Sequence, residues 1–297
     1  MTSLRLNGLG TALVTPFTEE NRVDAEAVRR LAQRQIDGGV DMLVPCGTTG
    51  EAVTLSEEEY EEVLRAVVEA AAGRVPVIAG AGSNSTEKTI ETARRAASCG
   101  VDALLVVGPY YNKPTQEGYY QHFSAVAAAV DLPIVMYNVP GRTGGNIAAE
   151  TQLRIATIEN VVAVKEASGD LGQQYLVLRG RPEGFAVLSG DDNLVLPQIA
   201  AGLDGVISVV ANETPEEFAR MVHLAMDGDF DSAREIHFRL LDLLDGNFIE
   251  SNPVPVKAAM AMMELCRPNV RLPLVPLRKD NGDRLRRILL ALDLVRE

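Results

Sequence analysis

Short apolar runs alternate with longer amphipathic stretches through most of this 297-residue chain. The runs are continuously apolar and rich in Val, Ile, Leu and Ala, as expected for parallel strands that helices cover on both faces. Eight such strands are predicted, at residues 11–15, 42–45, 75–79, 103–107, 134–137, 161–165, 186–188 and 205–209.

The amphipathic stretches carry the start and stop signals of helices. Asp24 can cap a helix that ends before Gly38. Ser56 opens the next helix, and Glu59, three residues later, completes a capping-box pattern. Gly228 ends the last helix of the alternating part of the chain.

Eight strand–helix units, spaced by roughly 20 to 35 residues, predict an α/β fold of the (β/α)8 barrel type. A doubly wound sheet is the alternative, but it would leave two edge strands and usually has fewer units. Beyond Gly228 the strand pattern stops, and residues 229–245, 255–265 and 281–294 read as helices. We therefore expect a catalytic barrel over residues 1–228 and a C-terminal α-helical domain over residues 229–297, without a flexible linker.

The formal net charge of −13 argues against nucleic acid and anionic membranes as partners, because both would be repelled. The N-terminal stretch MTSLRLNGLG lacks the apolar segment of a signal peptide. No apolar run reaches the roughly 18 residues that span a bilayer. The three cysteines show no CxxC spacing and predict neither a disulfide framework nor a zinc site. A cytoplasmic protein is expected.

In a barrel, functional groups gather where the strands end. Lys165, one of only five lysines, ends an apolar strand. Desolvation there lowers the pKa of an amine and frees its neutral form to attack a carbonyl. An ion pair with Glu166 or another carboxylate is the alternative, and position alone leaves both open. Lys257 follows a proline-rich stretch, and we expect its charged end to reach solvent from a helix start.

Three other features of the strand ends have both a functional and a structural interpretation. The stretch GTTGE, residues 47–51, is either an anion cradle of backbone N–H groups and hydroxyls or an ordinary turn. Tyr110, Tyr111 and Tyr137 either pack with one hydrogen bond each or relay protons. Arg142 either clamps a carboxylate or lies free at a loop tip.

Metal and nucleotide cofactors are not expected. The acidic pair Asp191 and Asp192 has no histidine companion, since His122, His223 and His237 fall in predicted helices and read as surface or capping residues. Neither GxGxxG nor GxxxxGK[ST] occurs. The sequence thus predicts chemistry performed by side chains alone, with no metal and no cofactor.

Five motifs occur in a fixed order at the predicted strand ends: GTTGE, PYYNKPTQEG, YNVPGRTG, VKEASGD and LSGDD. Together they resemble those of the dihydrodipicolinate synthase family over essentially the whole chain. The resemblance implies condensation of pyruvate with L-aspartate 4-semialdehyde through a lysine Schiff base, in lysine and diaminopimelate biosynthesis. It also implies a homotetramer built as a dimer of dimers.

The resemblance also implies roles for individual residues. Lys165 matches the lysine that forms the imine, and Tyr137, Thr48 and Tyr111 match a proton relay, with Tyr111 reaching the site across a subunit interface. The remaining matches are substrate-binding positions: Thr49 and Ile207 match pyruvate contacts, Gly190 matches a glycine that lines the site, and Arg142 matches the arginine that receives the semialdehyde carboxylate.

N-acetylneuraminate lyase and 2-keto-3-deoxygluconate-type aldolases belong to the same superfamily and also use a lysine and pyruvate. The arginine of the GRTG loop separates them, because it suits a small aldehyde that bears a carboxylate. A barrel that binds small acids without turnover is a further alternative. Trapping of a pyruvate adduct with borohydride would distinguish it from an enzyme.

The site at which lysine inhibits many family members departs from the family pattern. Asn84 and Tyr110 match, but Lys88 stands where a glutamate would meet the ammonium of the effector, and Glu57 and Tyr60 occupy the histidine positions. A repulsive charge in place of an attractive one weakens binding. We expect weak or absent inhibition by lysine.

Overall fold

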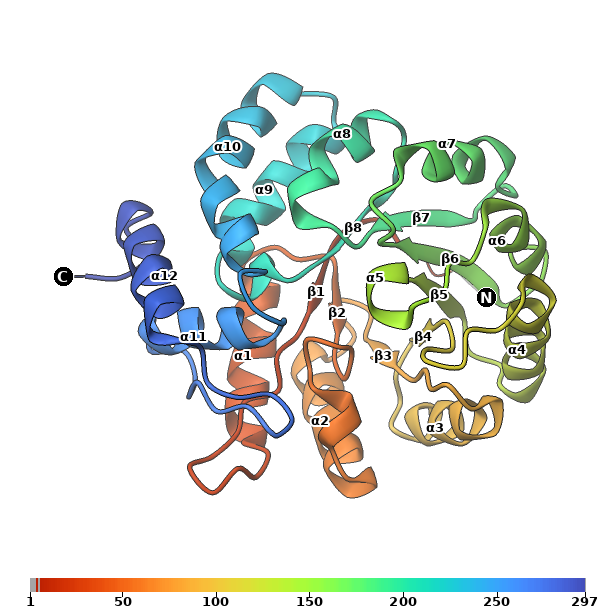
Figure 1. Cartoon of the computed structure of the whole chain (residues 1–297), viewed down its shortest axis with the longest axis horizontal. Helices are drawn as coiled ribbons and strands as arrows, with labels where there is room; N and C mark the ends of the chain where they lie inside the picture. The colour runs from red at the N-terminus through yellow and green to blue at the C-terminus, as the bar shows by residue number, and fades with distance from the viewer. Residues whose placement is uncertain (1–3, 5, 297) are drawn as a thin grey trace.

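The computed structural model describes residue 4 and residues 6–296. Eight parallel strands form one sheet in the order β2-β1-β8-β7-β6-β5-β4-β3 (Figure 1). A parallel bridge between Leu43 and Val77 joins its two ends, so the sheet closes into the predicted (β/α)8 barrel. The strands are β1 (Gly8–Ala12), β2 (Met42–Val44), β3 (Ile78–Gly80), β4 (Ala103–Val107), β5 (Ile134–Asn138), β6 (Val161–Glu166), β7 (Ala186–Ser189) and β8 (Gly205–Ser208).

Helices surround the barrel, and their predicted caps are confirmed. The Asp24 side chain accepts from the N–H of Ala27 at 2.9 Å, and Ser56 and Glu59 form the capping box. The helices are α1 (Ala25–Asp37), α2 (Glu57–Ala71), α3 (Thr86–Ser98), α4 (Gln116–Ala129), α5 (Pro140–Thr143), α6 (Ala149–Ile155), α7 (Leu171–Gly180), α8 (Val195–Ala200), α9 (Pro215–Met226), α10 (Phe230–Gly246), α11 (Val254–Met262) and α12 (Lys279–Ala291), with short 3₁₀ helices η1 (Ala52–Thr54), η2 (Asp192–Leu194) and η3 (Val210–Asn212).

Two strands begin elsewhere than predicted. The strand expected at residues 11–15 is β1, three residues earlier, because its pairing with β8 starts at Gly8, whose φ of +86° favours glycine. The strand expected at residues 75–79 is β3, which starts at Ile78. Pro76 lies before this strand and has no N–H to donate. Only its carbonyl takes part in the sheet, where it accepts a hydrogen bond from the N–H of Leu43.

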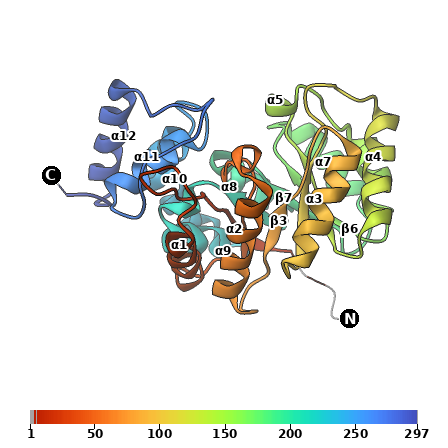
Figure 2. The same ribbon diagram turned by 90° about the horizontal axis from the view of Figure 1, so that it is seen from below.

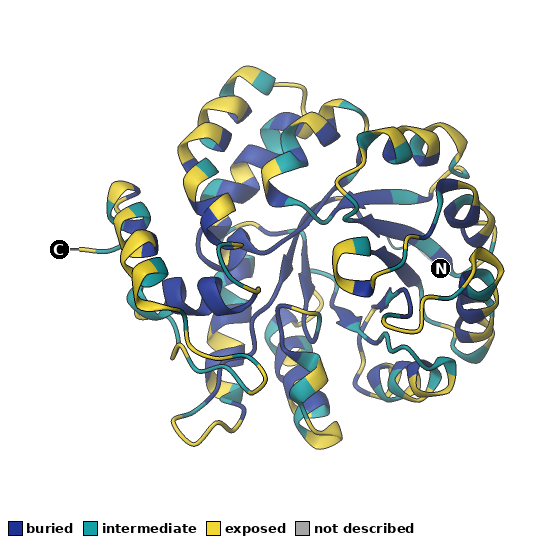
Figure 3. Cartoon of the chain, viewed as in Figure 1, coloured by how far each residue is buried: buried dark blue, intermediate teal, exposed yellow. Residues whose placement is uncertain are grey.

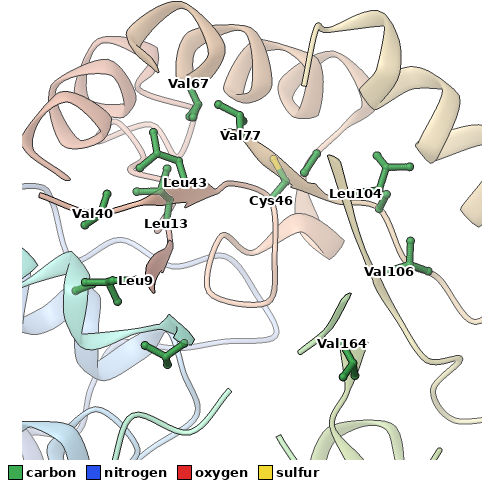
Figure 4. Packing of buried hydrophobic residues seen from close by; sticks show 14 of the residues in the cluster. Leu9, Leu13, Val40, Leu43, Cys46, Val67, Val77, Leu104, Val106 and Val164 are labelled. Atoms are coloured by element: carbon green, nitrogen blue, oxygen red, sulfur yellow. The ribbon is translucent and has the colours of Figure 1, made fainter. Parts of the chain in front are cut away.

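Side chains of each strand alternate between two apolar layers. Leu9, Leu43, Leu104 and Val164 point outward and pack with the surrounding helices in the larger core (Figure 4). Met42, Leu105, Ala163 and other inward-facing residues fill the barrel interior. Both layers are shielded from water, and Figure 3 shows the strands mostly in the colour of buried residues.

One irregularity in the sheet sets the alignment of β5 and β6. Ile134 pairs with Val161, but Val135 pairs with Ala163, so Val162 is an extra residue in β6. As a result Tyr137 lies opposite Lys165.

The C-terminal helices lie to one side of the barrel (Figure 2). Helix α10 packs against α9, and α12 packs against α10 and α11. We propose that the boundary between barrel and helical domain follows Gly228. No helix in the described part of the chain is long and apolar enough to cross a bilayer.

The expectation of surface or capping histidines is wrong at two positions. His122 and His237 are only 4% and 6% exposed, because each lies on the inward face of its helix. Burial lowers the pKa of His122 to about 4, so its ring is neutral near pH 7. His223 lies in the last turn of α9, half exposed, with Nε2 2.7 Å from Oδ2 of Asp41.

Candidate active site

A pocket of about 610 Å³ opens at the carboxyl ends of the strands. Loops that follow β2, β3, β4 and β5 form its walls. Thr48, Tyr137 and Arg142 border it together, although Thr48 lies about ninety positions before the other two in the sequence. The barrel therefore brings these three polar side chains to one mouth.

Lys165 lies at the end of β6 and is 6% exposed. Its Nζ is 4.7 Å from the centroid of the Tyr137 ring. Burial lowers the pKa of Lys165 to about 8, and the positive charge of Arg142 acts in the same direction. The carboxylates of Asp192 and Asp191 oppose this shift. A substantial fraction of the amine is therefore neutral and nucleophilic in mildly alkaline solution.

The alternative of an ion pair with Glu166 does not hold: no salt bridge joins Lys165 to any described residue. Glu166 is fully buried and belongs to a separate network. Its carboxylate accepts from Asn138 Nδ2 at 3.0 Å and from the N–H of Ser168 at 2.9 Å. The side chains of Gln152 and Gln173 donate to it as well. These bonds hold the ends of β5 and β6 together beneath Tyr137 and Lys165.

Tyr137 ends β5 and is 8% exposed. Burial raises its pKa to about 12, with a further increase from Asp191. Arg142 and the nearby hydroxyl of Thr48 lower this pKa and so act in the opposite direction. The phenol thus stays protonated near neutral pH while it remains next to a hydroxyl that can exchange a proton with it.

Gly190 follows β7 at a point where a side chain would not fit. A Cβ there would lie 2.9 Å from Cε of Lys165 and 2.5 Å from Cβ of Ala167. The backbone after β7 therefore closes directly onto the amine-bearing side chain. Ile207, fully buried in β8, belongs to the same apolar interior as Tyr137 and contributes a wall without polar groups.

The GTTGE loop turns sharply after β2. Gly50 and Glu51 donate backbone hydrogen bonds to Gly47 and Thr48, at 3.1 Å each. The N–H groups of Thr48 and Thr49 donate to none of the described residues, so both are free for an anion. Thr49 Oγ1 accepts from Asn252 Nδ2 at 2.9 Å and keeps its own proton for donation.

The expectation that Lys257 reaches solvent is wrong. Lys257 is completely buried in α11, and its Nζ donates to Glu51 Oε1 at 2.7 Å and to the carbonyl of Thr15 at 2.9 Å. Its ammonium also lies 4.1 Å from the centroid of the Phe17 ring. The stretch around Lys257 carries no local sign of this pairing, because Glu51 lies more than 200 positions earlier.

Asp191 and Asp192 lie close enough to Lys165 to affect its pKa. Asp192 Oδ2 accepts from the N–H groups of Val209 and Val210. Burial raises the pKa of Asp191 to about 6. No group of metal-ligating side chains occurs in the described residues. The sequence pattern had suggested only metal binding as a role for these two carboxylates.

Five predicted site residues are not among those that border the pocket, namely Thr49, Lys165, Gly190, Ile207 and Tyr111, and of these Tyr111 alone is exposed. Its side chain is 87% exposed in the loop after β4, and its φ is +73°. Its backbone N–H donates to the carbonyl of Thr143 at 3.1 Å, which fixes the loop against α5. The aromatic ring thus projects away from the barrel into solvent.

The pocket continues between α2 and α3, where the residues of the predicted effector site lie. Glu57, Tyr60, Lys88 and Tyr110 all border this part. The Tyr60 hydroxyl donates to the carbonyl of Gly80 at 2.9 Å and is therefore already occupied. Lys88 and Arg95 contribute positive charges to this part of the pocket, and Glu57 and Glu91 contribute negative ones.

The chain resembles known proteins over nearly its whole length. The profile of the dihydrodipicolinate synthetase family matches residues 5–292. The 4-hydroxy-tetrahydrodipicolinate synthase of Koribacter versatilis (strain Ellin345) is 52% identical over 286 residues, 96% of this chain and 95% of that protein. The structure of the first monomeric dihydrodipicolinate synthase variant has a TM-score of 0.96 at 42% identity and covers 98% of both chains. That of the chloride-inhibited dihydrodipicolinate synthase from Acinetobacter baumannii, complexed with pyruvate, has a TM-score of 0.95 at 40% identity, covering 97% of this chain and 99% of that one.

Proposed function

The chain belongs to the dihydrodipicolinate synthetase family, and we infer that it is a lyase that condenses pyruvate with L-aspartate 4-semialdehyde. This is the 4-hydroxy-tetrahydrodipicolinate synthase reaction of lysine and diaminopimelate biosynthesis. The observation that supports the chemistry most directly is the state of Lys165. It is a buried amine without a salt-bridge partner among the described residues, and its pKa is lowered to about 8.

The reaction begins with attack of the neutral Lys165 amine on the ketone carbon of pyruvate. The resulting carbinolamine loses water and becomes an iminium ion, which acidifies the neighbouring methyl group. The free N–H groups of Thr48 and Thr49 and the Thr49 hydroxyl suit the carboxylate of pyruvate. Gly190 and Ile207 border the space around the imine without competing polar groups.

Tyr137 and Thr48 move protons at this centre. Tyr137 lies beside Lys165 and close to the Thr48 hydroxyl, so a proton taken from the methyl group or given to the carbinolamine oxygen can pass along the pair. The exposed ring of Tyr111 completes the relay from a second subunit. Because that ring lies outside the pocket of its own chain, activity depends on association.

The enamine then adds to the aldehyde carbon of the second substrate. The guanidinium of Arg142, at the rim of the pocket, binds the carboxylate of L-aspartate 4-semialdehyde in two-pronged fashion. The amine of that substrate attacks the imine carbon, closes the ring and releases Lys165. One water is lost when the imine forms, and none is consumed afterwards, which balances the condensation.

We propose a homotetramer, built as a dimer of dimers, in the cytoplasm. Exposure of Tyr111 supports the tighter interface, since an aromatic side chain that is 87% exposed is a suitable contact for a second copy. A monomeric variant occurs among the similar structures. Sedimentation or light scattering of this chain therefore measures its oligomeric state directly.

Reduction with borohydride in the presence of pyruvate tests the proposal. Intact mass measurement should show one pyruvate-derived unit per chain at Lys165, and a Lys165→Arg variant should show none. Absence of the adduct from the unmodified protein would leave a barrel that only binds small acids. To separate the synthase from a sugar-acid lyase, kcat/KM is compared for both classes of aldehyde, and L-aspartate 4-semialdehyde should be preferred.

A further inference from the structure

Residues of the C-terminal helical segment form hydrogen bonds with the GTTGE loop. Asn252 Nδ2 donates to Thr49 Oγ1 at 2.9 Å, and Lys257 Nζ donates to Glu51 Oε1 at 2.7 Å. The other carboxylate oxygen of Glu51 accepts from the N–H of Arg271 at 3.0 Å. Thus Thr49 and Glu51, on either side of Gly50, are both bound by residues that follow α10.

These contacts are shielded from water. Lys257 is fully buried, Glu51 is 3% exposed and Asn252 is 6% exposed. A charge pair at such depth is sensitive to geometry, because either ion left alone would be unsolvated. The pair therefore fixes the position of Glu51 more firmly than a surface ion pair could.

The loop needs such support because its backbone is strained. Glu51 has a φ of +53° and Cys46, at the other end of the turn, has a φ of +55°. Such conformations persist at residues other than glycine only where the surroundings enforce them. Thr15 Oγ1 adds a bond to the carbonyl of Gly50 at 2.7 Å.

Thr48 depends on this support without touching it. Its carbonyl accepts from the N–H of Glu51 at 3.1 Å, so the position of Glu51 sets the end of the turn that carries Thr48. The side chain of Thr48 then meets Tyr137 on the pocket side. The C-terminal segment and the proton relay are therefore linked through a single turn of backbone.

We propose that Lys257 and Asn252 are positioning residues that fix the GTTGE turn for proton transfer through Thr48. This proposal rests on the function proposed above. It gives the C-terminal helices a part in the reaction, although none of their residues borders the pocket.

The test separates imine formation from proton transfer. The extent of borohydride trapping after equilibration with saturating pyruvate reports the imine at Lys165. The initial rate at which the pyruvate methyl group takes up deuterium from D2O reports proton removal and return. In Asn252→Ala and Lys257→Met, trapping should stay within about twofold of the unmodified protein, while the exchange rate falls by about tenfold or more.

Asn247→Ala is the matched control. Asn247 also follows α10, is fully buried, and donates one side-chain hydrogen bond at 2.5 Å to the barrel, but to Glu213 and not to the loop. Its exchange rate should stay within about threefold of the unmodified protein at a comparable loss of thermal stability. Asn252→Ala removes no charge, so it gives the decisive comparison even where Lys257→Met does not fold.

The possible results separate the two proposals. If the unmodified protein traps no pyruvate, the proposed function itself fails. If it traps and exchanges normally but Asn252→Ala exchanges as fast as Asn247→Ala, the positioning role is wrong. An equal loss of trapping and exchange in Asn252→Ala would also overturn it, because the damage would then lie at Lys165.

Discussion

Replacement of Lys165 by methionine should abolish imine formation and, at the same time, stabilise the fold at neutral pH. Methionine keeps an unbranched apolar side chain of similar length but carries no charge. In the folded protein the pKa of Lys165 is lowered from 10.5 to about 8. The unfolded chain therefore holds its proton more tightly than the folded chain does.

The sign and size of the effect follow from this difference. Between about pH 8 and pH 10.5 the unfolded state binds more protons at this residue, so the stability of the unmodified protein rises with pH in that window. Below it, both states are protonated and the full cost of the buried charge remains. At 1.36 kcal/mol per pKa unit, that cost is about 3 kcal/mol at pH 7 and falls to about 1 kcal/mol at pH 9.5.

Reversible urea unfolding at both pH values, at one fixed protein concentration, measures the difference. The gain in unfolding free energy of Lys165→Met should be largest at pH 7. Lys88→Met, which removes an exposed lysine of α3, is the control and should stay within about 0.5 kcal/mol at both pH values. The reasoning is refuted if Lys165→Met is no more stable than the unmodified protein at pH 7, or if its advantage does not shrink at pH 9.5.

Three further outcomes are expected. Gly190→Ala should lower the unfolding free energy by about 1–3 kcal/mol and kcat by about 100-fold, because the new Cβ would displace Cε of Lys165. Urea unfolding and a steady-state assay measure these two quantities. Gly141→Ala is the control and should change neither, because a Cβ at Gly141 meets nothing within 4 Å. Lys257→Met should destabilise by about 3–5 kcal/mol, the reverse of Lys165→Met, because it leaves a buried carboxylate unpaired; equal stability in urea would contradict the ion pair. L-lysine should inhibit weakly or not at all because Lys88 repels its ammonium, and a submillimolar inhibition constant would refute this.

Local signals predicted the parts of the fold that depend on neighbouring residues. The capping box at Ser56 and the run of β6 up to Lys165 could be read directly, because both involve residues a few positions apart. The start of β1 could not, because the residues from Gly8 to Thr15 are buried throughout, and only pairing with β8 decides where the strand begins.

The sequence predicted which types of residue form the site, but not which side chains hold them in position. The strand-end position of Lys165 suggested a desolvated amine, and the structure adds that Glu166 is engaged elsewhere, by Asn138 and three other groups. The role of Lys257 was out of reach, because a buried ammonium can only be anticipated if its carboxylate partner is known. That partner, Glu51, belongs to a turn at the opposite end of the chain.

The extra residue in β6 has a consequence for how this chain can change in length. Val162 shifts the register so that Lys165, and not Val164, lies opposite Tyr137. Deletion of Val162 would restore regular pairing and still leave Lys165 opposite Tyr137, because the pairs from Val135 and Ala163 onward would be unchanged. The bulge thus gives β6 one spare residue: the strand can lose one position between Val161 and Lys165 and keep the amine inside the barrel, whereas the loss of a second would turn it toward the helices.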